Sequence, residues 1–421
     1  MGFQLWESRH AEQAPSEKNA RRGLLVGWPV LALFVALPLV YFLVDFPVQP
    51  LLPLNFAAGG RGGVLPKVPR VERRCDVFKG RWVRDTNATY YSNATCPLIQ
   101  DQQNCLKLGR PDRDFLNWRW KPDECELPRF DPVRFLELMR GKSLAFIGDS
   151  VARNHLRSLM CLLYGVLDIP DDVTPKFIPE TRSRKWYFPE YNFTLARFWA
   201  PFLVKASNTD SLSKSYRADL RLDEPDESWA REIEKFDFVI LSAGHWFFRS
   251  LTFYEEGRLV GCSACWRSDV PNLTRHYGYR KAFQTAYRTL LKLEGYKGVT
   301  ILRTFSPEHF ENGSWNNGGR CLRTRPYTEA EIKLNGSNLE MHTTQMEEFR
   351  AAGREAAKRG LKFRLLDMTE AMLLRPDGHP NLYWHSRHVN TTSSDCLHWC
   401  LPGPVDTWNE LLLHVLISES V

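Results

Sequence analysis

The sequence predicts an α/β protein in which helices cover both faces of a mostly parallel β-sheet. Apolar, strand-like runs alternate with helical patterns through most of the chain, and this alternation is typical of parallel strands joined by helical crossovers. The predicted strands are residues 143–147, 193–204, 236–242, 298–304 and 361–366, and the predicted helices are residues 151–164, 275–293 and 343–359. Sheets of this kind place their sites at the carboxyl ends of the strands.

The segment before the first of these strands is expected to be loop-rich and cross-linked. From Cys75 to Cys125 the chain has little periodicity and many Cys, Trp and turn residues. A helix then begins at Asp131-Pro132, with the Asp as N-cap and the Pro at the first helical position, and Gly141 ends it.

The N-terminal region predicts a single membrane anchor. The run from Gly23 to Val44 is uncharged and mostly apolar, and at about 1.5 Å per residue it can span a bilayer core of roughly 30 Å. Several basic residues precede the run and the next one after it is Arg61, so the positive-inside rule puts the body of the protein in the lumen. A cleaved signal peptide is the alternative, although its apolar region is usually shorter and ends at small residues.

Sequons and cysteines agree with a lumenal body. The expected parts are a cytosolic tail (1–22), a transmembrane signal anchor (23–44), a flexible stem rich in Pro and Gly (45–74) and a lumenal domain (75–421) with a Cys- and Trp-rich section (75–142) and an α/β core (143–421). All ten cysteines follow the anchor, as expected where disulfides persist. The expected glycosylation sites are Asn87, Asn93, Asn192, Asn272, Asn312, Asn335 and Asn390. The net charge of +7 is spread along the chain and argues against a nucleic-acid partner.

A small polar motif, Gly148-Asp149-Ser150, follows the first predicted core strand and opens a predicted helix. A serine there meets the positive end of the helix dipole, and nearby backbone N–H groups are free to hold an oxyanion. Ser150 is therefore a candidate nucleophile, and a plain N-cap role is the alternative. The motif is not the Gly-x-Ser-x-Gly elbow of α/β-hydrolases, because residue 152 is Ala, and no phosphate-loop pattern follows it.

The matching base is sought among eleven histidines. His398 lies three residues after Asp395, so the two side chains can hydrogen-bond locally and leave the other ring nitrogen for a serine. Cys396 and Cys400 flank this histidine. Together with Cys262 and Cys265 they allow a structural zinc site as the alternative, but we expect disulfides and no metal in an oxidising lumen.

The paired motifs Gly148-Asp149-Ser150 and Asp395-x-x-His398 resemble those of the trichome birefringence-like family of plant cell-wall polysaccharide O-acetyltransferases. Further matching stretches are Asn104-Cys105-x-x-x-Gly109-Arg110-Pro111-Asp112, Trp118-Arg119-Trp120-Lys121-Pro122, Gly244-His245-Trp246 and the ending from His398 to Asn409. The likeness spans about residues 75–416, and the residues around both motifs look most like those of the xyloglucan acetyltransferases. It implies an SGNH/GDSL-esterase-like three-layer sandwich.

The resemblance assigns roles to the motif residues. It makes Ser150 the nucleophile, His398 the general base and Asp395 the group that orients it. By analogy with related esterases, the N–H groups of Ser150 and Gly244 are candidate oxyanion donors. The asparagine block of those esterases has no clear match, so Arg153 and Asn154, one helical turn past the serine, are candidate substitutes. A salt bridge and a helix-surface amide are their structural alternatives.

The same resemblance suggests disulfides and glycan contacts. The implied pairs are Cys75–Cys125, Cys96–Cys161 and Cys321–Cys396, with Cys262 or Cys265 bridged to Cys400 and with Cys105 unassigned. His245 and Trp246 are candidate substrate-binding residues. The tryptophans that could stack on sugar rings are Trp118, Trp120, Trp246, Trp315 and Trp384, each with core packing as the alternative.

The expected function is acetyl transfer to a hemicellulose, most simply xyloglucan, through an acetyl-serine intermediate. The alternatives are an acetyl esterase with the same triad, a xylan or mannan acetyltransferase, and a non-catalytic glycan-binding protein. No bound cofactor is expected, and the acetyl donor could be acetyl-CoA or an acetylated intermediate. The resemblance places the protein in the Golgi membrane as a type II protein, where other wall-synthesis proteins are possible partners.

Overall fold

The computed structural model describes residues 75–167, 170–175, 183–207, 217–265, 268–385 and 393–420. The predicted tail, anchor and stem (1–74) and the sequon at Asn390 lie outside these ranges. Within the described ranges, no helix combines the length and the apolar character that a bilayer crossing needs. The membrane anchor thus stays a prediction.

A seven-stranded sheet forms the centre of the fold, in the order β13-β12-β9-β3-β6-β5-β4. Its five strands from β13 to β6 are parallel, whereas β5 and β4 join one edge antiparallel. The strands are β3 (Ser143–Gly148), β4 (Asp171–Asp172), β5 (Arg184–Phe188), β6 (Phe193–Trp199), β9 (Phe238–Ser242), β12 (Val299–Arg303) and β13 (Lys362–Leu366). The predicted mostly parallel sheet is confirmed.

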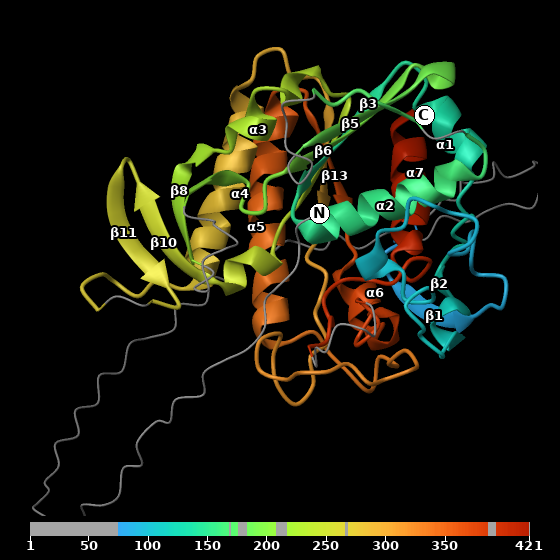
Figure 1. Ribbon diagram of the computed structural model, residues 1–421. Coiled ribbons are helices and arrows are strands. Elements are labelled where there is room, and N and C mark those ends of the chain that lie inside the picture. Colours follow the sequence, from blue (N-terminus) through green and yellow to red (C-terminus); the bar gives the residue numbers. More distant parts are fainter. Residues whose placement is uncertain are drawn as a thin grey trace, which may run out of the picture. The chain divides into compact units, whose positions relative to one another are not determined.

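Helices cover both faces of this sheet, as Figure 1 shows. In β3, Leu144 and Phe146 pack into the core beneath α1, α2 and α7, whereas Ala145 and Ile147 pack toward α4 and α5. Successive strand residues point to opposite faces, so the unbroken apolar run of this strand is what a sheet buried on both sides requires. The helices are α1 (Pro132–Leu138), α2 (Ser150–Tyr164), α3 (Glu227–Ala230), α4 (Arg275–Lys292), α5 (Gly336–Lys358), α6 (Thr369–Leu373) and α7 (Asp406–Ser420).

The predicted start of the first helix is confirmed in detail. The Asp131 side chain accepts a hydrogen bond from the N–H of Arg134, and Pro132 occupies the first helical position. Gly141 follows the helix with φ of +69°, a left-handed conformation that glycine adopts without strain.

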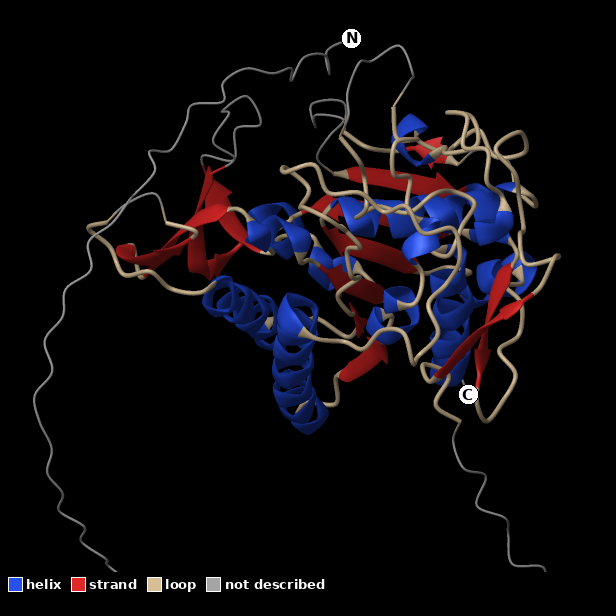
Figure 2. Cartoon of the chain, turned by 90° about the horizontal axis from the view of Figure 1, so that it is seen from below, coloured by secondary structure: helices blue, strands red, loops and turns tan. Residues whose placement is uncertain are grey.

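The Cys- and Trp-rich section is not an independent core. Its two strands, β1 (Gly80–Arg84) and β2 (Trp118–Pro122), pair antiparallel, and Trp82 and Trp120 meet edge to face between them. Both tryptophans belong to the core beneath α2 and α7, and Trp82 donates to the carbonyl of Ala371 in α6. For Trp120 the core-packing alternative holds, because its side chain is buried. Figure 2 shows the same section beside the helices from below.

A second sheet of four strands lies beyond α4, in the order β11-β10-β8-β7. Its strands are β7 (Val204–Ser207), β8 (Arg217–Pro225), β10 (Ser250–Glu255) and β11 (Arg258–Ser263). The predicted single strand 193–204 is therefore wrong at its end. Leu203 has φ of +62° and its N–H bonds the Ala200 carbonyl, so the chain turns there and leaves the central sheet. Short 3-10 helices connect the elements: η1 (Asp101–Gln103), η2 (Asp114–Leu116), η3 (Pro189–Tyr191), η4 (Ile233–Lys235), η5 (His245–Phe248) and η6 (Pro376–Gly378).

Five disulfides use all ten cysteines, which leaves none as a zinc ligand. Three predicted pairs are confirmed, namely Cys75–Cys125, Cys96–Cys161 and Cys321–Cys396. The predicted bridge from Cys262 or Cys265 to Cys400 is wrong. Cys262 lies in β11 of the second sheet and pairs locally with Cys265, whereas Cys400 pairs with Cys105 across 295 residues.

Candidate active site

Ser150 is the first residue of α2 and follows β3 after a sharp turn. Gly148 has φ of +155°, and a Cβ built there would lie 1.7 Å from the Ser242 carbonyl oxygen, so no larger residue fits. Asp149, not Ser150, is the N-cap: its carboxylate accepts the N–H of Val151 at 2.9 Å. The N-cap alternative for Ser150 therefore does not hold, and the hydroxyl of Ser150 is left for other chemistry.

His398 links Ser150 to Asp395. The Ser150 Oγ lies 2.7 Å from His398 Nε2, and His398 Nδ1 lies 2.8 Å from Asp395 Oδ2. The second carboxylate oxygen of Asp395 accepts the backbone N–H groups of Leu397 and His398, at 3.1 and 2.9 Å. Two segments 248 residues apart thus bring a hydroxyl, an imidazole and a carboxylate into one line, the arrangement of a nucleophile, its base and the group that orients the base.

The charge on Asp395 fixes how the imidazole carries its proton. Burial alone would raise the pKa of Asp395, but the charge of His398 and the hydrogen bonds from His398 and Leu397 lower this pKa to about 2. The carboxylate is ionised at neutral pH and accepts the Nδ1–H. Nε2 then presents its lone pair to the serine hydroxyl.

The loop that carries His398 has no regular secondary structure and is held by neighbouring segments. Residues 378–381 run beside it: the Gly378 carbonyl accepts the N–H of Cys400, and Asn381 and Asp395 exchange two backbone hydrogen bonds. The N–H of His309 donates to the Cys396 carbonyl at 3.0 Å. The disulfides at Cys396 and Cys400 fix both sides of the histidine.

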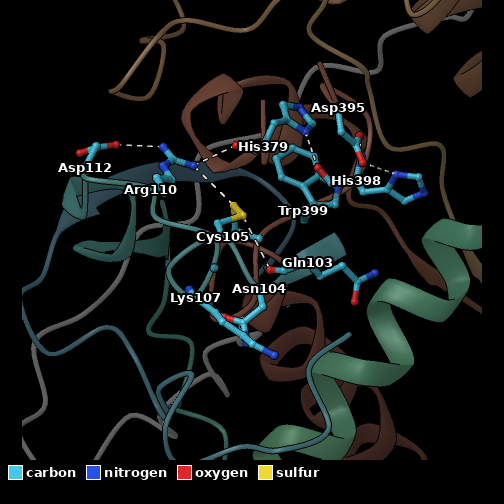
Figure 3. Close-up of a disulfide and its surroundings, with 12 residues drawn as sticks. Gln103, Asn104, Cys105, Lys107, Arg110, Asp112, His379, Asp395, His398 and Trp399 are labelled. Atoms are coloured by element: carbon cyan, nitrogen blue, oxygen red, sulfur yellow. Dashed lines mark hydrogen bonds and ion pairs between the residues drawn. A yellow bond between two sulfur atoms is a disulfide. The ribbon is translucent and has the colours of Figure 1, made fainter. Parts of the chain in front are cut away.

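Arg110, from the Cys- and Trp-rich section, braces the segment 377–379 that lies beside this loop (Figure 3). Its guanidinium donates to the carbonyls of His379 and Asp377, at 2.9 and 2.6 Å, and to the Asp112 carboxylate at 2.9 Å. It also lies 3.9 Å from the centre of the Phe115 ring. In the sequence this arginine belongs to a stretch that resembles the family, but no local pattern there indicates a role beside the base.

The beginning of α7 anchors the loop on its other side. Asp406 accepts hydrogen bonds from the hydroxyls of Tyr91 and Ser158, at 2.7 and 2.5 Å, and Glu410 accepts one from Tyr90. Burial raises the pKa of Asp406 to about 6 and that of Glu410 to about 7. These buried carboxyl groups join α7 to α2 and to the Cys- and Trp-rich section.

Two predicted oxyanion donors are already engaged. The N–H of Gly244 donates to Asp149 Oδ2 at 3.2 Å. Asn154 is buried, and its amide donates to the carbonyl of Trp399 at 3.2 Å and accepts the N–H of Trp399 at 2.7 Å. Asn154 is therefore neither a surface amide nor a donor aimed at the serine, because its face of α2 packs against the loop after His398. Arg153 stays a predicted donor; burial lowers its pKa, and the charge of Asp149 opposes this effect.

Aromatic side chains gather around the carboxyl ends of β6 and β9. Trp246 meets Trp199 edge to face with ring centres 5.5 Å apart, and the Arg249 guanidinium lies 3.7 Å from the Trp246 ring centre. Trp199 stands opposite Gly148 in the register of β6 and β3, and Arg153 lies 5.8 Å from its ring centre. Trp199 was not predicted as a site residue, because the predicted strand 193–204 placed it mid-strand, whereas β6 ends at this residue.

His245 lies next to this group and is neutral at ordinary pH. Burial lowers its pKa to about 3, and the charges of His398 and Arg303 act in the same direction. Its ring centre lies 4.6 Å from that of Phe305. Among the other predicted stacking residues, Trp118 and Trp384 are half-buried and Trp315 is exposed, and Trp384 donates to the carbonyl of Ser393.

Comparison with known proteins defines the class. Residues 127–415 match the model of the GDSL/SGNH-like acyl-esterase family found in Pmr5 and Cas1p, and residues 73–126 match the PMR5 N-terminal domain. The chain therefore belongs to this GDSL/SGNH-like acyl-esterase family.

Individual relatives show which members of this family the chain is similar to. The chain is 48% identical to protein trichome birefringence-like 20 of Arabidopsis thaliana over 354 residues, which cover 83% of this chain and 73% of that protein. It is 44% identical to xyloglucan O-acetyltransferase 4 of Populus trichocarpa over 388 residues, with 91% of each chain covered. Xyloglucan O-acetyltransferase 2 of Arabidopsis thaliana is 42% identical over 360 residues, covering 84% and 85%. The resemblance to the trichome birefringence-like proteins is confirmed.

Proposed function

We propose that this protein is an O-acetyltransferase that moves acetyl groups onto sugar hydroxyls of a polysaccharide, with xyloglucan as the acceptor. The observation that carries the proposal is the continuous hydrogen-bonded line from Ser150 through His398 to Asp395. The names of the relatives, several of which are xyloglucan O-acetyltransferases, support the choice of reaction and acceptor.

The first half of the reaction forms an acetyl-serine. Ser150 Oγ gives its proton to His398 Nε2 and attacks the acetyl carbonyl of the donor, while Asp395 stabilises the imidazolium through Nδ1–H. The tetrahedral intermediate collapses, the bond to the donor breaks, and the leaving group takes the proton from Nε2. Acetyl-CoA or an acetylated intermediate is the proposed donor.

The second half returns the enzyme to its starting state. A sugar hydroxyl gives its proton to His398 Nε2 and attacks the acetyl-serine carbonyl. Collapse of this second tetrahedral intermediate breaks the bond to Ser150, whose oxygen recovers the proton from Nε2. Water in place of the sugar would give an esterase, so transfer requires that the acceptor fills the space beside the acetyl group.

The aromatic group beside Ser150 supports a carbohydrate acceptor. Trp199 ends β6, Trp246 lies in η5 just after β9, and both are half-buried. Arg153 lies one helical turn past the serine. Amphipathic aromatic rings offer broad apolar faces to the C–H faces of sugars. Arg153 and Arg249 supply donors for hydroxyl groups.

A lumenal location, in the Golgi membrane as a type II protein, is part of the proposal. Six of the seven sequon asparagines lie in the described ranges, and all six are exposed, as glycosylation requires. The five disulfides suit an oxidising compartment. Other wall-synthesis proteins of that compartment are its proposed partners.

The test is an acceptor assay with a matched pair of serine variants. The full chain is incubated with acetyl-CoA or a small activated acetyl ester and with xyloglucan, xylan or mannan oligosaccharides, and acetylated products are read by mass spectrometry. We expect xyloglucan oligosaccharides to gain acetyl groups, Ser150→Ala to abolish the gain, and Ser228→Ala, an exposed serine on α3, to leave it unchanged.

Each other outcome overturns a stated part of the proposal. Release of acetate without any acetylated acceptor would make the protein an esterase. Gains on xylan or mannan alone would replace the acceptor. Unchanged transfer by Ser150→Ala would remove the nucleophile, and no reaction with any donor or acceptor would favour a non-catalytic glycan-binding protein.

A further inference from the structure

Two buried histidines form a chain of hydrogen bonds that ends on the backbone of the base. His309 Nε2 lies 2.9 Å from the carbonyl oxygen of Leu373, and His309 Nδ1 lies 2.7 Å from His379 Nε2. His379 Nδ1 lies 2.6 Å from the carbonyl oxygen of His398. Both rings are buried, so water does not replace these contacts.

The number of protons in this chain follows from its two ends. A carbonyl oxygen only accepts, so the ring nitrogens that face Leu373 and His398 must each carry a proton. The contact between the two rings needs a proton as well, because two facing lone pairs repel. The chain thus requires three protons, whereas two neutral imidazoles carry two. With all three contacts made, the pair holds one positive charge.

We propose that His309 and His379 share this third proton, and that its presence determines whether the His398 carbonyl is held in its working position. His379 is then a positioning residue for the reaction, and it acts through the residue to which its Nδ1–H donates. The functional part of this inference rests on the proposed role of His398 as the base.

Loss of the third proton breaks the chain at one end. If His309 keeps its bond to Leu373, the proton between the rings lies on His379 Nε2, and a bare His379 Nδ1 then faces the His398 carbonyl. If His379 keeps its bond to His398, a bare nitrogen faces Leu373 instead. The neutral pair therefore holds the His398 carbonyl for only part of the time, and the base becomes less well placed.

The surroundings both oppose and favour the shared charge. Trp399 stacks on His379 with ring centres 4.0 Å apart, which favours a cation, and the ionised Asp395 also favours it. Arg110 and Arg375 bring positive charge, but Arg110 pairs with Asp112 and Arg375 with Asp377. His398 opposes the charge when protonated.

Burial sets the pH range in which the two histidines lose their third proton. Burial lowers the pKa of His309 to about 4, and burial together with the neighbouring ring lowers the pKa of His379 well below its usual range. The pair consequently gives up its third proton at a lower pH than an exposed histidine, whose pKa is about 6.5. We expect kcat to fall as the pH rises through this acidic range, on the alkaline side of the optimum that the rest of the reaction sets.

The activity test separates the proton from the positioning. In His309→Gln, an amide can donate to His379 Nε2 without a third proton, so the fall of kcat on the alkaline side should disappear while kcat at the optimum stays within about threefold. His379→Phe keeps a ring against Trp399 but has no donor, so kcat should fall by about tenfold or more at every pH, with KM little changed. His276→Gln, at an ion pair between α4 and α5, is the matched control and should behave as wild type.

A proton count tests the pair without any activity. Nitrogen NMR of isotope-labelled histidine in the full-length Ser150→Ala variant should show three protonated ring nitrogens on these two residues at acidic pH and two at higher pH. Two protonated nitrogens at every pH at which the protein stays folded would overturn the shared proton. An unchanged alkaline fall in His309→Gln, or a wild-type kcat in His379→Phe, would overturn its effect on the base. If no acetyl transfer is found at all, the proposed function fails and the NMR count still decides the state of the pair.

Discussion

The nucleophile and the base are held in place in different ways. Ser150 is positioned locally, by the strand β3, the tight turn at Gly148 and the cap of α2 by Asp149. His398 lies in a loop that distant parts of the chain hold through two disulfides and His379, and Arg110 in turn holds the segment of His379. Asn154 joins the two systems, because it sits on the nucleophile's helix and bonds the backbone after the base.

This difference indicates which parts of the active site tolerate substitution. A residue at the start of a core helix keeps its place as long as the sheet and helix form. A residue in an irregular loop keeps its place only while its separate supports remain, and some of these supports are covalent or depend on proton state. Disturbing the supports of His398 should therefore affect turnover more than it affects the fold.

The largest effect is expected from Asp395→Asn, which disturbs the orientation of the base and leaves Ser150 untouched. An asparagine amide can donate to His398 Nδ1, so the ring proton would move to Nε2 and face the serine hydroxyl. We expect kcat to fall by roughly 10⁴-fold, the scale for loss of the orienting acid in a Ser-His-Asp triad. Acetyl transfer and circular dichroism measure the activity and the fold, with the exposed Asp123→Asn as control. Full activity would show that Asp395 does not orient the base.

The next largest effect on turnover and stability is expected from opening the disulfide beside His398, compared with opening a disulfide in the second sheet. Replacing both Cys105 and Cys400 with Ser opens a link across 295 residues beside His398, whereas the same change at Cys262 and Cys265 opens a link across three. Loss of the long link should cost about 2–5 kcal/mol in the free energy of unfolding, and the chain-entropy difference between the loops is roughly 4 kcal/mol.

Urea unfolding and kcat measure this pair of variants. The Cys105 and Cys400 variant should also lose turnover, because the loop of His398 gains freedom, while the Cys262 and Cys265 variant should keep it. Equal turnover in the two variants would mean that the base does not need its covalent support.

The smallest effect concerns the pH dependence of the anchor at α7. Burial raises the pKa of Glu410 to about 7, above the value of about 4.3 for an exposed glutamate. Between these values the folded state binds more protons than the unfolded state, so the free energy of unfolding falls as the pH rises toward 7. Glu410→Gln keeps an acceptor for Tyr90 and removes the titration, so this fall should shrink by roughly 1–3 kcal/mol. Urea unfolding at about pH 5 and about pH 7.5, on the two sides of this pKa, measures the fall. An equal fall in the variant would assign the dependence to another group, such as Asp406.

The features that are local in sequence were predicted well. Strand and helix periodicity located the sheet, and the two motifs around Ser150 and His398 identified the residues that the structure brings together. The strand 193–204 was predicted too long, because its apolar character continues through the turn at Leu203 into another sheet.

The features that depend on distant contacts were not predictable from one sequence. Nothing local distinguishes Cys105 from Cys262 as the partner of Cys400. The engagement of the Gly244 N–H by Asp149 and of Asn154 by Trp399 depends on how loops pack around the sheet. His309 and His379 are 70 residues apart, and neither lies in a motif of its own.

The link between Cys105 and Cys400 has a consequence for how the protein is made. A ribosome makes Cys105 early and Cys400 only 295 residues later. Until Cys400 has been made and has reached the oxidising compartment, the thiol of Cys105 lacks its native partner, so this disulfide forms late in oxidative maturation. A product that stopped before Asp395 would carry the serine but lack both the base and the residue that orients it.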